Sequence, residues 1–553
     1  MNIAVFQAGL RAGGRRIGTA TVLSLLATTS VPALTADELW TAWKTDYAAL
    51  GYEVKTGGAT RNGDTLTITD LALSHQIEDP DTAGTSDTAG TPDTAGTNDT
   101  TAAPETPVTI TTRSEIDIPR MDLREQGDGS VVVTMAPTIT ARSDVTRTGD
   151  DPVSVRLRVD QQDLITLVSG TPEALDYRLT APKVTVTLID DTPAPKAGAK
   201  PEAAPKGSTP APSPTEFVLT LGGIASNYAT KTVDGRQTQT SDTKVATLDV
   251  KAAGSDDETG VSYTLSATAA NLAGSNQATV PAGTDMTDMG ALLAQGASFA
   301  FSGTYGAASL DVTQTTEGKP MEIVASAQSG AVNGAMSAAG FRYSAQSQHP
   351  HLAVTQAPDS LLSAPMSADL EATSAEFAFP VSQNDQPQPF TGKIALNGLT
   401  LSDSVWAMFD PAQKLPRTPA ELVIDLGGTA KVSNDLLTSA PLPEAGMPVT
   451  VESVALNRLH LSLAGLDLAG TGAATIDNGS GTPVPAGSVD LSLTGADALM
   501  SNLVAIGLIE QQQTMIVKMM LGLYAVPAGT DAYTSKIEMK PTGEILANGQ
   551  RIR

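Results

Sequence analysis

The 553-residue chain carries 60 acidic and 34 basic residues, giving a formal net charge of −26, and it contains no cysteine. The lack of cysteine excludes disulfides, thiolate metal sites and thiol nucleophiles, and the acidic balance argues against a nucleic-acid partner, which needs clustered Lys and Arg. Hydrophobic residues make up 41% of the chain, enough to bury a large core.

Residues 1–36 have the organisation of a secretory signal peptide. A basic region ending at Arg15-Arg16 precedes a short apolar run at 17–27, and small residues follow, with cleavage expected after Ala33 or Ala36. The run is too short to serve as a transmembrane anchor. The arginine pair leaves twin-arginine export open beside the general secretory route, which we favour because the rest of the twin-arginine motif is missing. We therefore expect a periplasmic or secreted protein.

Two stretches of low complexity divide the mature chain. Residues 78–106 repeat Asp-Thr-Ala-Gly-Thr with a period of six and lack large apolar side chains, which predicts a disordered insert. Residues 191–215 are rich in Pro and Ala and predict an extended linker. The linker separates an N-terminal β region at 37–190 from a C-terminal β region at 216–553.

Outside these stretches, apolar and small polar residues alternate. The period of two is typical of half-buried strands and is clear at 64–73, 153–159, 184–188, 393–396 and 459–463. Gly- and Asp-containing turns separate such runs. We therefore predict a mainly β protein with large curved antiparallel sheets, trough-like or sandwich-like, each covered on one face.

Three segments have helical periodicity instead. Residues 37–50 predict an N-terminal helix capped by Asp37, residues 285–295 a second helix, and residues 497–524 a helical hairpin. The last helix carries an apolar stripe of Met515, Ile516, Met519, Met520 and Leu523. We expect this stripe to pack against the sheet; a surface that faces a ligand or a membrane is the alternative. The hairpin contains charged residues, so no segment of the mature chain is expected to span a bilayer.

The chain shows no recognisable catalytic constellation. It lacks the His-Glu-x-x-His, Gly-x-Ser-x-Gly and Walker motifs. His349 and His351 flank a proline, but no third ligand stands near them, so we predict neither a metal site nor a cofactor. This favours a protein that is not an enzyme.

The segment 406–428 contains Trp406, Phe409 and Asp410-Pro411 and resembles a characteristic stretch of the family called domain of unknown function 2125. Residues 36–43 and 499–550 are also similar to members of that family, which are exported alphaproteobacterial proteins. The resemblance implies export but no activity, cofactor or partner. From the residues themselves, we expect Trp406 and Phe409 to fill a packing corner, with partner docking as the alternative.

Three functions are consistent with this sequence. The first is an envelope protein that binds a lipid or another hydrophobic molecule in a β-sheet groove closed by the helical hairpin. The second is a periplasmic structural or assembly factor that contacts an envelope protein, and the third is a hydrolase with an unrecognised site. The residues expected to contact a ligand or partner are Trp406, Phe409, Met515, Met519 and Met520.

Overall fold

The computed structural model describes residues 33–49, 51–80, 109–147, 153–172, 174–189, 214–256, 259–281, 288–357, 364–438, 448–479 and 481–553. The described residues form two compact units, which meet in sequence between Gly222 and Gly223. Most of the leader, of the insert expected at 78–106 and of the linker expected at 191–215 lies outside the described residues; positions 78–80 and 214–215 belong to strands.

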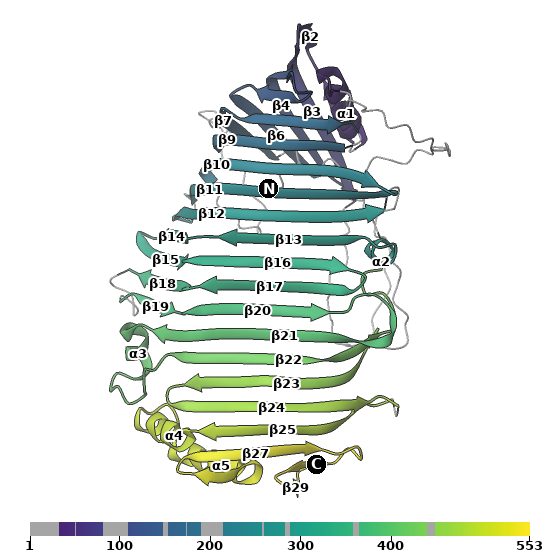
Figure 1. The fold of residues 1–553 in the computed structure, drawn as a ribbon. Helices are drawn as coiled ribbons and strands as arrows, with labels where there is room; N and C mark the ends of the chain where they lie inside the picture. The colour runs from purple at the N-terminus through teal and green to yellow at the C-terminus, as the bar shows by residue number, and fades with distance from the viewer. Residues whose placement is uncertain are drawn as a thin grey trace, which may run out of the picture. The chain divides into compact units, whose positions relative to one another are not determined.

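Unit 1 consists of antiparallel strands and one helix (Figure 1). Strands β3, β4 and β9 are long, and each pairs with different neighbours along its two halves. The elements are α1 (Ala36–Ala49), β1 (Glu53–Lys55), β2 (Gly58–Asn62), β3 (Thr65–Pro80), β4 (Thr109–Glu125), β5 (Val131–Met135), β6 (Thr138–Arg147), β7 (Val153–Gln162), β8 (Ile165–Thr171) and β9 (Ala174–Ile189).

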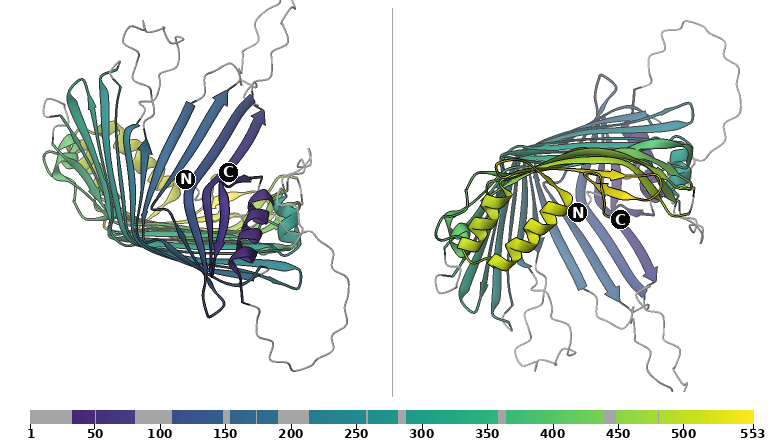
Figure 2. Two further views of the ribbon diagram at one scale, coloured as in Figure 1. Left: turned by 90° about the horizontal axis from the view of Figure 1, so that it is seen from above. Right: turned by 90° about the horizontal axis from the view of Figure 1, so that it is seen from below.

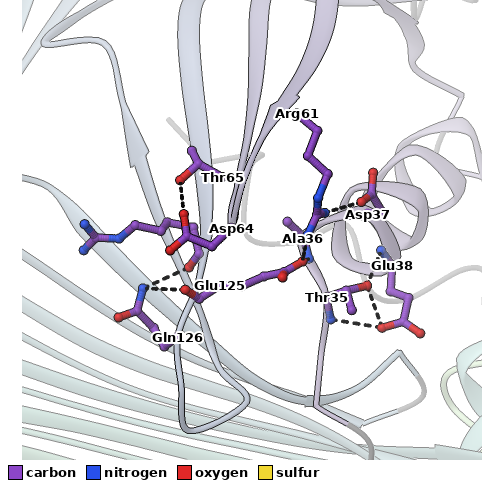
Figure 3. Close-up of polar contacts among 10 residues, drawn as sticks. Thr35, Ala36, Asp37, Glu38, Arg61, Asp64, Thr65, Glu125 and Gln126 are labelled. Atoms are coloured by element: carbon purple, nitrogen blue, oxygen red, sulfur yellow. Dashed lines mark hydrogen bonds and ion pairs between the residues drawn. The ribbon is translucent and has the colours of Figure 1, made fainter.

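Helix α1 covers one face of this sheet. Leu39 and Trp40 are buried, and they belong to the same core cluster as Ile68 on β3 and Val133 on β5. The cap prediction was wrong by two residues: α1 begins at Ala36, and Thr35 forms the reciprocal hydrogen bonds of a capping box with Glu38 (Figure 3).

Unit 2 is a longer antiparallel sheet with four helices (Figure 1). Its helices are α2 (Met289–Ala294), α3 (Asp403–Phe409), α4 (Ala496–Ala505) and α5 (Gln511–Tyr524). Its strands are β10 (Pro214–Val233), shared with unit 1, and β11 (Arg236–Asp256), β12 (Val261–Pro281), β13 (Ser298–Tyr305), β14 (Ala308–Thr316), β15 (Lys319–Ala327), β16 (Ser329–Ser337), β17 (Gly340–Gln348), β18 (His351–Gln356), β19 (Met366–Asp369), β20 (Ala372–Phe379), β21 (Asn384–Leu401), β22 (Ala420–Val432), β23 (Val449–Leu463), β24 (Leu466–Asp477), β25 (Val484–Thr494), β26 (Val526–Gly529), β27 (Ala532–Met539), β28 (Ile545–Ala547) and β29 (Gln550–Arg551).

A crease crosses the sheet of unit 2 and divides it into two walls (Figure 2). One half of β12 pairs with β13 and the other half with β14, and β21 likewise pairs with both β19 and β20. We call β13, β16, β17 and β20 the first wall, and β14, β15, β18 and β19 the second. At the crease the backbone takes up positive φ at Asn271, His349 and Gly398. Backbone hydrogen bonds such as Gly306 N to Ala270 O (2.7 Å) keep neighbouring strands connected there.

The crease keeps the apolar residues of both walls on one face. In β11, Val245 pairs with Leu272 on one side of the crease, and Leu248 pairs with Ala269 on the other. Side chains of a regular strand alternate between its two faces, so residues three apart, such as Val245 and Leu248, would point to opposite faces. The irregular residue between them at the crease brings both side chains back to the same face. The same spacing recurs from Leu396 to Leu399 in β21, and in unit 1 from Ile68 to Leu71, where Asp70 has a φ of 49°.

These observations confirm the predicted fold class, which is mainly β and antiparallel with an N-terminal helix and a C-terminal pair of helices. The second helix is shorter than expected: α2 begins at Met289, capped by the side chain of Asp288.

Candidate functional site: an apolar groove in unit 2

A groove with a volume of about 720 Å³ lies along the crease, on the apolar face of the first wall. It is lined by residues of seven strands from β11 to β21, which the ladder brings side by side. The side chains that define its apolar lining are Val245, Leu272, Val332, Ala345, Ala375, Ile394 and Leu396.

The floor of the groove is hollow because one row of paired residues is small. Gly274, Gly303, Val332, Ala345 and Ala375 face one another across successive strands. Side chains of this size leave open the space that larger residues would fill. The taller rims are Leu272 at one end of the groove and, at the other, the pair on β21 formed by Ile394 and Leu396.

Three of the polar side chains that line the groove, Thr243, Tyr305 and Ser347, lie within hydrogen-bond distance of another hydroxyl. The hydroxyl of Tyr305 lies 3.2 Å from Ser347 Oγ, and Thr243 Oγ1 lies 2.7 Å from Ser226 Oγ. Among the residues that line the groove, as far as the structure describes the chain, there is no carboxylate, histidine, lysine or arginine. The site therefore offers dispersion contacts and desolvation of apolar surface, and no charged group for acid–base chemistry.

The apolar face continues beyond the groove. One ladder row runs from Leu396 through Leu422, Leu461 and Leu468 to Leu493, from β21 to β25. Several large side chains of this face are substantially exposed: Phe301 41%, Phe377 38%, Ile394 41%, Leu396 36% and Leu426 37%. Exposed apolar surface of this extent is typical of a binding site.

Trp406 and Phe409 lie away from the groove, at the packing corner that the sequence favoured. Trp406 is 8% exposed and forms a cluster with Leu415 and Ala464, against which Phe409 packs. The buried Asp410 carboxylate ends α3 and accepts the backbone N–H groups of Lys414 (2.8 Å) and Leu415 (2.9 Å). Burial opposes ionisation of this carboxyl, but the two hydrogen bonds outweigh it and hold the pKa of Asp410 below its usual value.

Met515, Met519 and Met520 are on the surface of α5. They are 70%, 63% and 50% exposed, and Ile516 and Leu523 are each 52% exposed. The prediction that this stripe packs against the sheet is therefore wrong. Neither α4 nor α5 contributes a residue to the lining of the groove, so the expectation that the hairpin closes it is not met.

Two of the histidines, His351 and His460, contact carboxylates. His351 Nδ1 lies 2.6 Å from Asp369 Oδ1, while His349 lies on the crease. His460 lies between Asp467 (Nε2 to Oδ2, 2.9 Å) and Glu421 (Nδ1 to Oε1, 3.2 Å). In the described part of the chain no three His, Asp or Glu residues are grouped as a metal site requires.

Comparison of the chain with protein-family models, with curated proteins and with solved structures found no match. The resemblance of residues 406–428 to the family named above thus stays a prediction. Sequence reasoning missed every residue of the groove, although one signal was present: the spacing of three between apolar residues at Val245–Leu248 and Leu396–Leu399 marks the crease.

Proposed function

We propose that this protein binds a lipid or another hydrophobic molecule in the groove of unit 2 and performs no chemistry on it. The observation that carries the proposal is the combination of an uncharged lining with an uncovered apolar face. The groove volume of about 720 Å³ is in the range typical of small-molecule sites. Each methylene group removed from water contributes about 0.8 kcal/mol, so an acyl chain gains enough to offset the cost of its ordering.

Lipid extraction and native mass spectrometry of the purified full-length protein test this proposal. We expect a co-purifying hydrophobic molecule, and displacement of a lipophilic fluorescent dye by added fatty acid or phospholipid. Ile394→Asp places a charge on the rim of the groove and should abolish both signals, because a carboxylate buried against an acyl chain has no partner.

Thr391→Asp is the matched control, since Thr391 is exposed on the opposite face of the same strand. This variant should bind like the unaltered protein. Absence of any extracted hydrophobe together with absence of dye displacement, or equal binding by both variants, would contradict the proposal.

We also propose that the protein is exported and that its leader is removed after Ala33. Leu34 is 3% exposed and donates its N–H to Gly129 O (3.1 Å), and Thr35 caps α1. The buried Ala36 donates its N–H to Glu125 Oε1 (2.8 Å), which also accepts from Arg61 (Figure 3). Cleavage after Ala36 would remove the cap, at a cost of about 1 kcal/mol, together with the buried Leu34. These contacts therefore favour cleavage after Ala33 over cleavage after Ala36.

N-terminal sequencing of the protein from the periplasm or medium checks this proposal. We expect Leu34 as the first residue. Ala33 is exposed, so Ala33→Arg should block processing and leave the fold intact, because cleavage requires a small residue at that position. A mature chain that begins at Asp37 would contradict the cleavage point, and an unprocessed cytosolic chain would contradict export.

A further inference from the structure

Helix α5 directs its apolar residues toward solvent. Met515, Met519 and Leu523 follow one another at a spacing of four, as do Ile516, Met520 and Tyr524, so the six form two adjacent stripes. All six are at least 40% exposed. A surface helix of a soluble domain normally shows the opposite arrangement, with its apolar stripe against the core.

Polar contacts hold α5 in this orientation. Thr514 is its only fully buried residue, and its only charged side chain, Lys518, forms an ion pair with Asp497 of α4 at 2.9 Å. At the other end, Tyr524 O accepts hydrogen bonds from Ser535 Oγ and from Asn548 Nδ2 (3.0 Å). The Lys518 side chain is itself 54% exposed, but it lies outside the two apolar stripes, which contain no charged residue.

The C-terminal segment that contains α5 carries no net charge. Residues 496–553 contain five acidic and five basic residues and are neutral, whereas the whole chain has a net charge of −26. A strongly acidic protein is repelled by the negative surface of most membranes, and the neutral segment 496–553 does not add to that repulsion.

The length of α5 limits how it meets a bilayer. Its 14 residues measure about 21 Å at 1.5 Å per residue, which is shorter than the roughly 30 Å of a hydrocarbon core. Among the described residues no helix is long and apolar enough to cross a membrane. A helix of this kind, with an uncharged apolar face, is suited to lie in the plane of the interface.

We propose that α5 docks the protein on a lipid bilayer by inserting Met515, Met519 and Leu523 into the interfacial layer. The unbranched, flexible methionines suit a fluid partner better than a partner of fixed shape. Tyr524, at the end of the helix, has the amphipathic ring that prefers the headgroup level. This inference does not depend on ligand binding in the groove, and a separate experiment tests it.

Because the chain has no cysteine, single labels are free of background. Met519→Cys in the full-length protein carries an environment-sensitive nitrobenzoxadiazole label, and Met408→Cys on α3, where Met408 is 59% exposed, is the control. With phosphatidylcholine vesicles we expect a blue shift and an intensity gain at position 519 only. The triple variant M515S/M519S/L523S should lose co-flotation with the vesicles and stay folded, because the three side chains are already exposed.

Three results would overturn the proposal. The first is equal flotation of the triple variant and the unaltered protein. The second is the same spectral change at positions 408 and 519. The third is a blue shift at 519 that follows protein concentration without vesicles, which would mean that a second copy of the chain covers α5. Ile394→Asp should float like the unaltered protein, so failure of groove binding and failure of membrane docking are distinguishable.

Discussion

The ring of Tyr305 occupies the space where a side chain of Gly330 would stand. The two residues pair across β13 and β16, and a Cβ built at residue 330 would lie 2.3 Å from Tyr305 Cζ. The ring extends on to β17, where its hydroxyl meets Ser347. Because the ring lies along the sheet over a glycine, it covers backbone without filling the groove.

Gly330→Val should therefore displace the Tyr305 ring toward the groove. We expect a loss of roughly 1–3 kcal/mol in the free energy of unfolding from overpacking, measured by urea denaturation, and weaker displacement of the lipophilic dye. Gly274→Ala is the control for the stability measurement alone, because the nearest atom to its added Cβ is Ser302 O at 3.5 Å, whereas its place in the groove floor makes it unsuitable for the dye measurement. An equal loss of stability in the two variants would contradict the role of Tyr305.

The crease geometry predicts that substitutions at two of its positions have opposite effects on the stability of the protein. Gly398 has a φ of +69°, and a Cβ there would lie 2.5 Å from Glu371 Cγ, so Gly398→Val should destabilise the protein by at least about 1–2 kcal/mol. Asn271 has a φ of 53°, which glycine adopts without strain, so Asn271→Gly should be neutral or stabilising. Urea denaturation of both variants checks the pair; a loss at Asn271→Gly as large as at Gly398→Val would count against the crease geometry.

His460 should make stability depend on pH. Its contacts with Asp467 and then Glu421 raise the pKa of the imidazole above its usual value. The stabilisation from a raised histidine pKa is complete below the pKa of the unfolded chain, about 6.5, and is lost as the pH rises through the folded value. The Tm difference between the unaltered protein and His460→Gln should thus be larger near pH 5.5 than at pH 8.5. A difference that grows with pH would contradict this assignment.

Asp410 should give stability the opposite dependence on pH from that of His460. Its lowered pKa means that its contribution to stability is present above the carboxyl pKa of the unfolded chain and is lost as the pH falls through the folded value. Asp410→Asn should lower the Tm at pH 7 and have less effect in acid. Asp385→Asn is the control, because the Asp385 side chain is exposed. If the Tm change caused by Asp410→Asn did not depend on pH, the shape of the residue 410 side chain, and not its charge, would account for its contribution to stability.

Much of the fold was predictable because it follows from local patterns. Alternation at 64–73 and 459–463 gave β3 and β23, and helical spacing gave α1 and the α4–α5 pair. The cap of α1 was misplaced because Asp37 and Thr35 both suit an N-cap, and only the backbone hydrogen bonds to Thr35 distinguish them. The groove was not predictable from these patterns, because its lining joins strands that are separated by up to about 150 residues, from Thr243 to Leu396.

The amino-acid sequence alone determined which residues share a face of each strand or helix, since periodicity is a property of the chain itself. It placed Leu396 and Ile394 on one side of β21, and Met515 and Met519 on one side of α5. Only the tertiary structure decided what covers those faces. Trp406 is enclosed by Leu415 and Ala464, whereas the methionines and the groove are left open, because burial depends on which distant segments fold against a face.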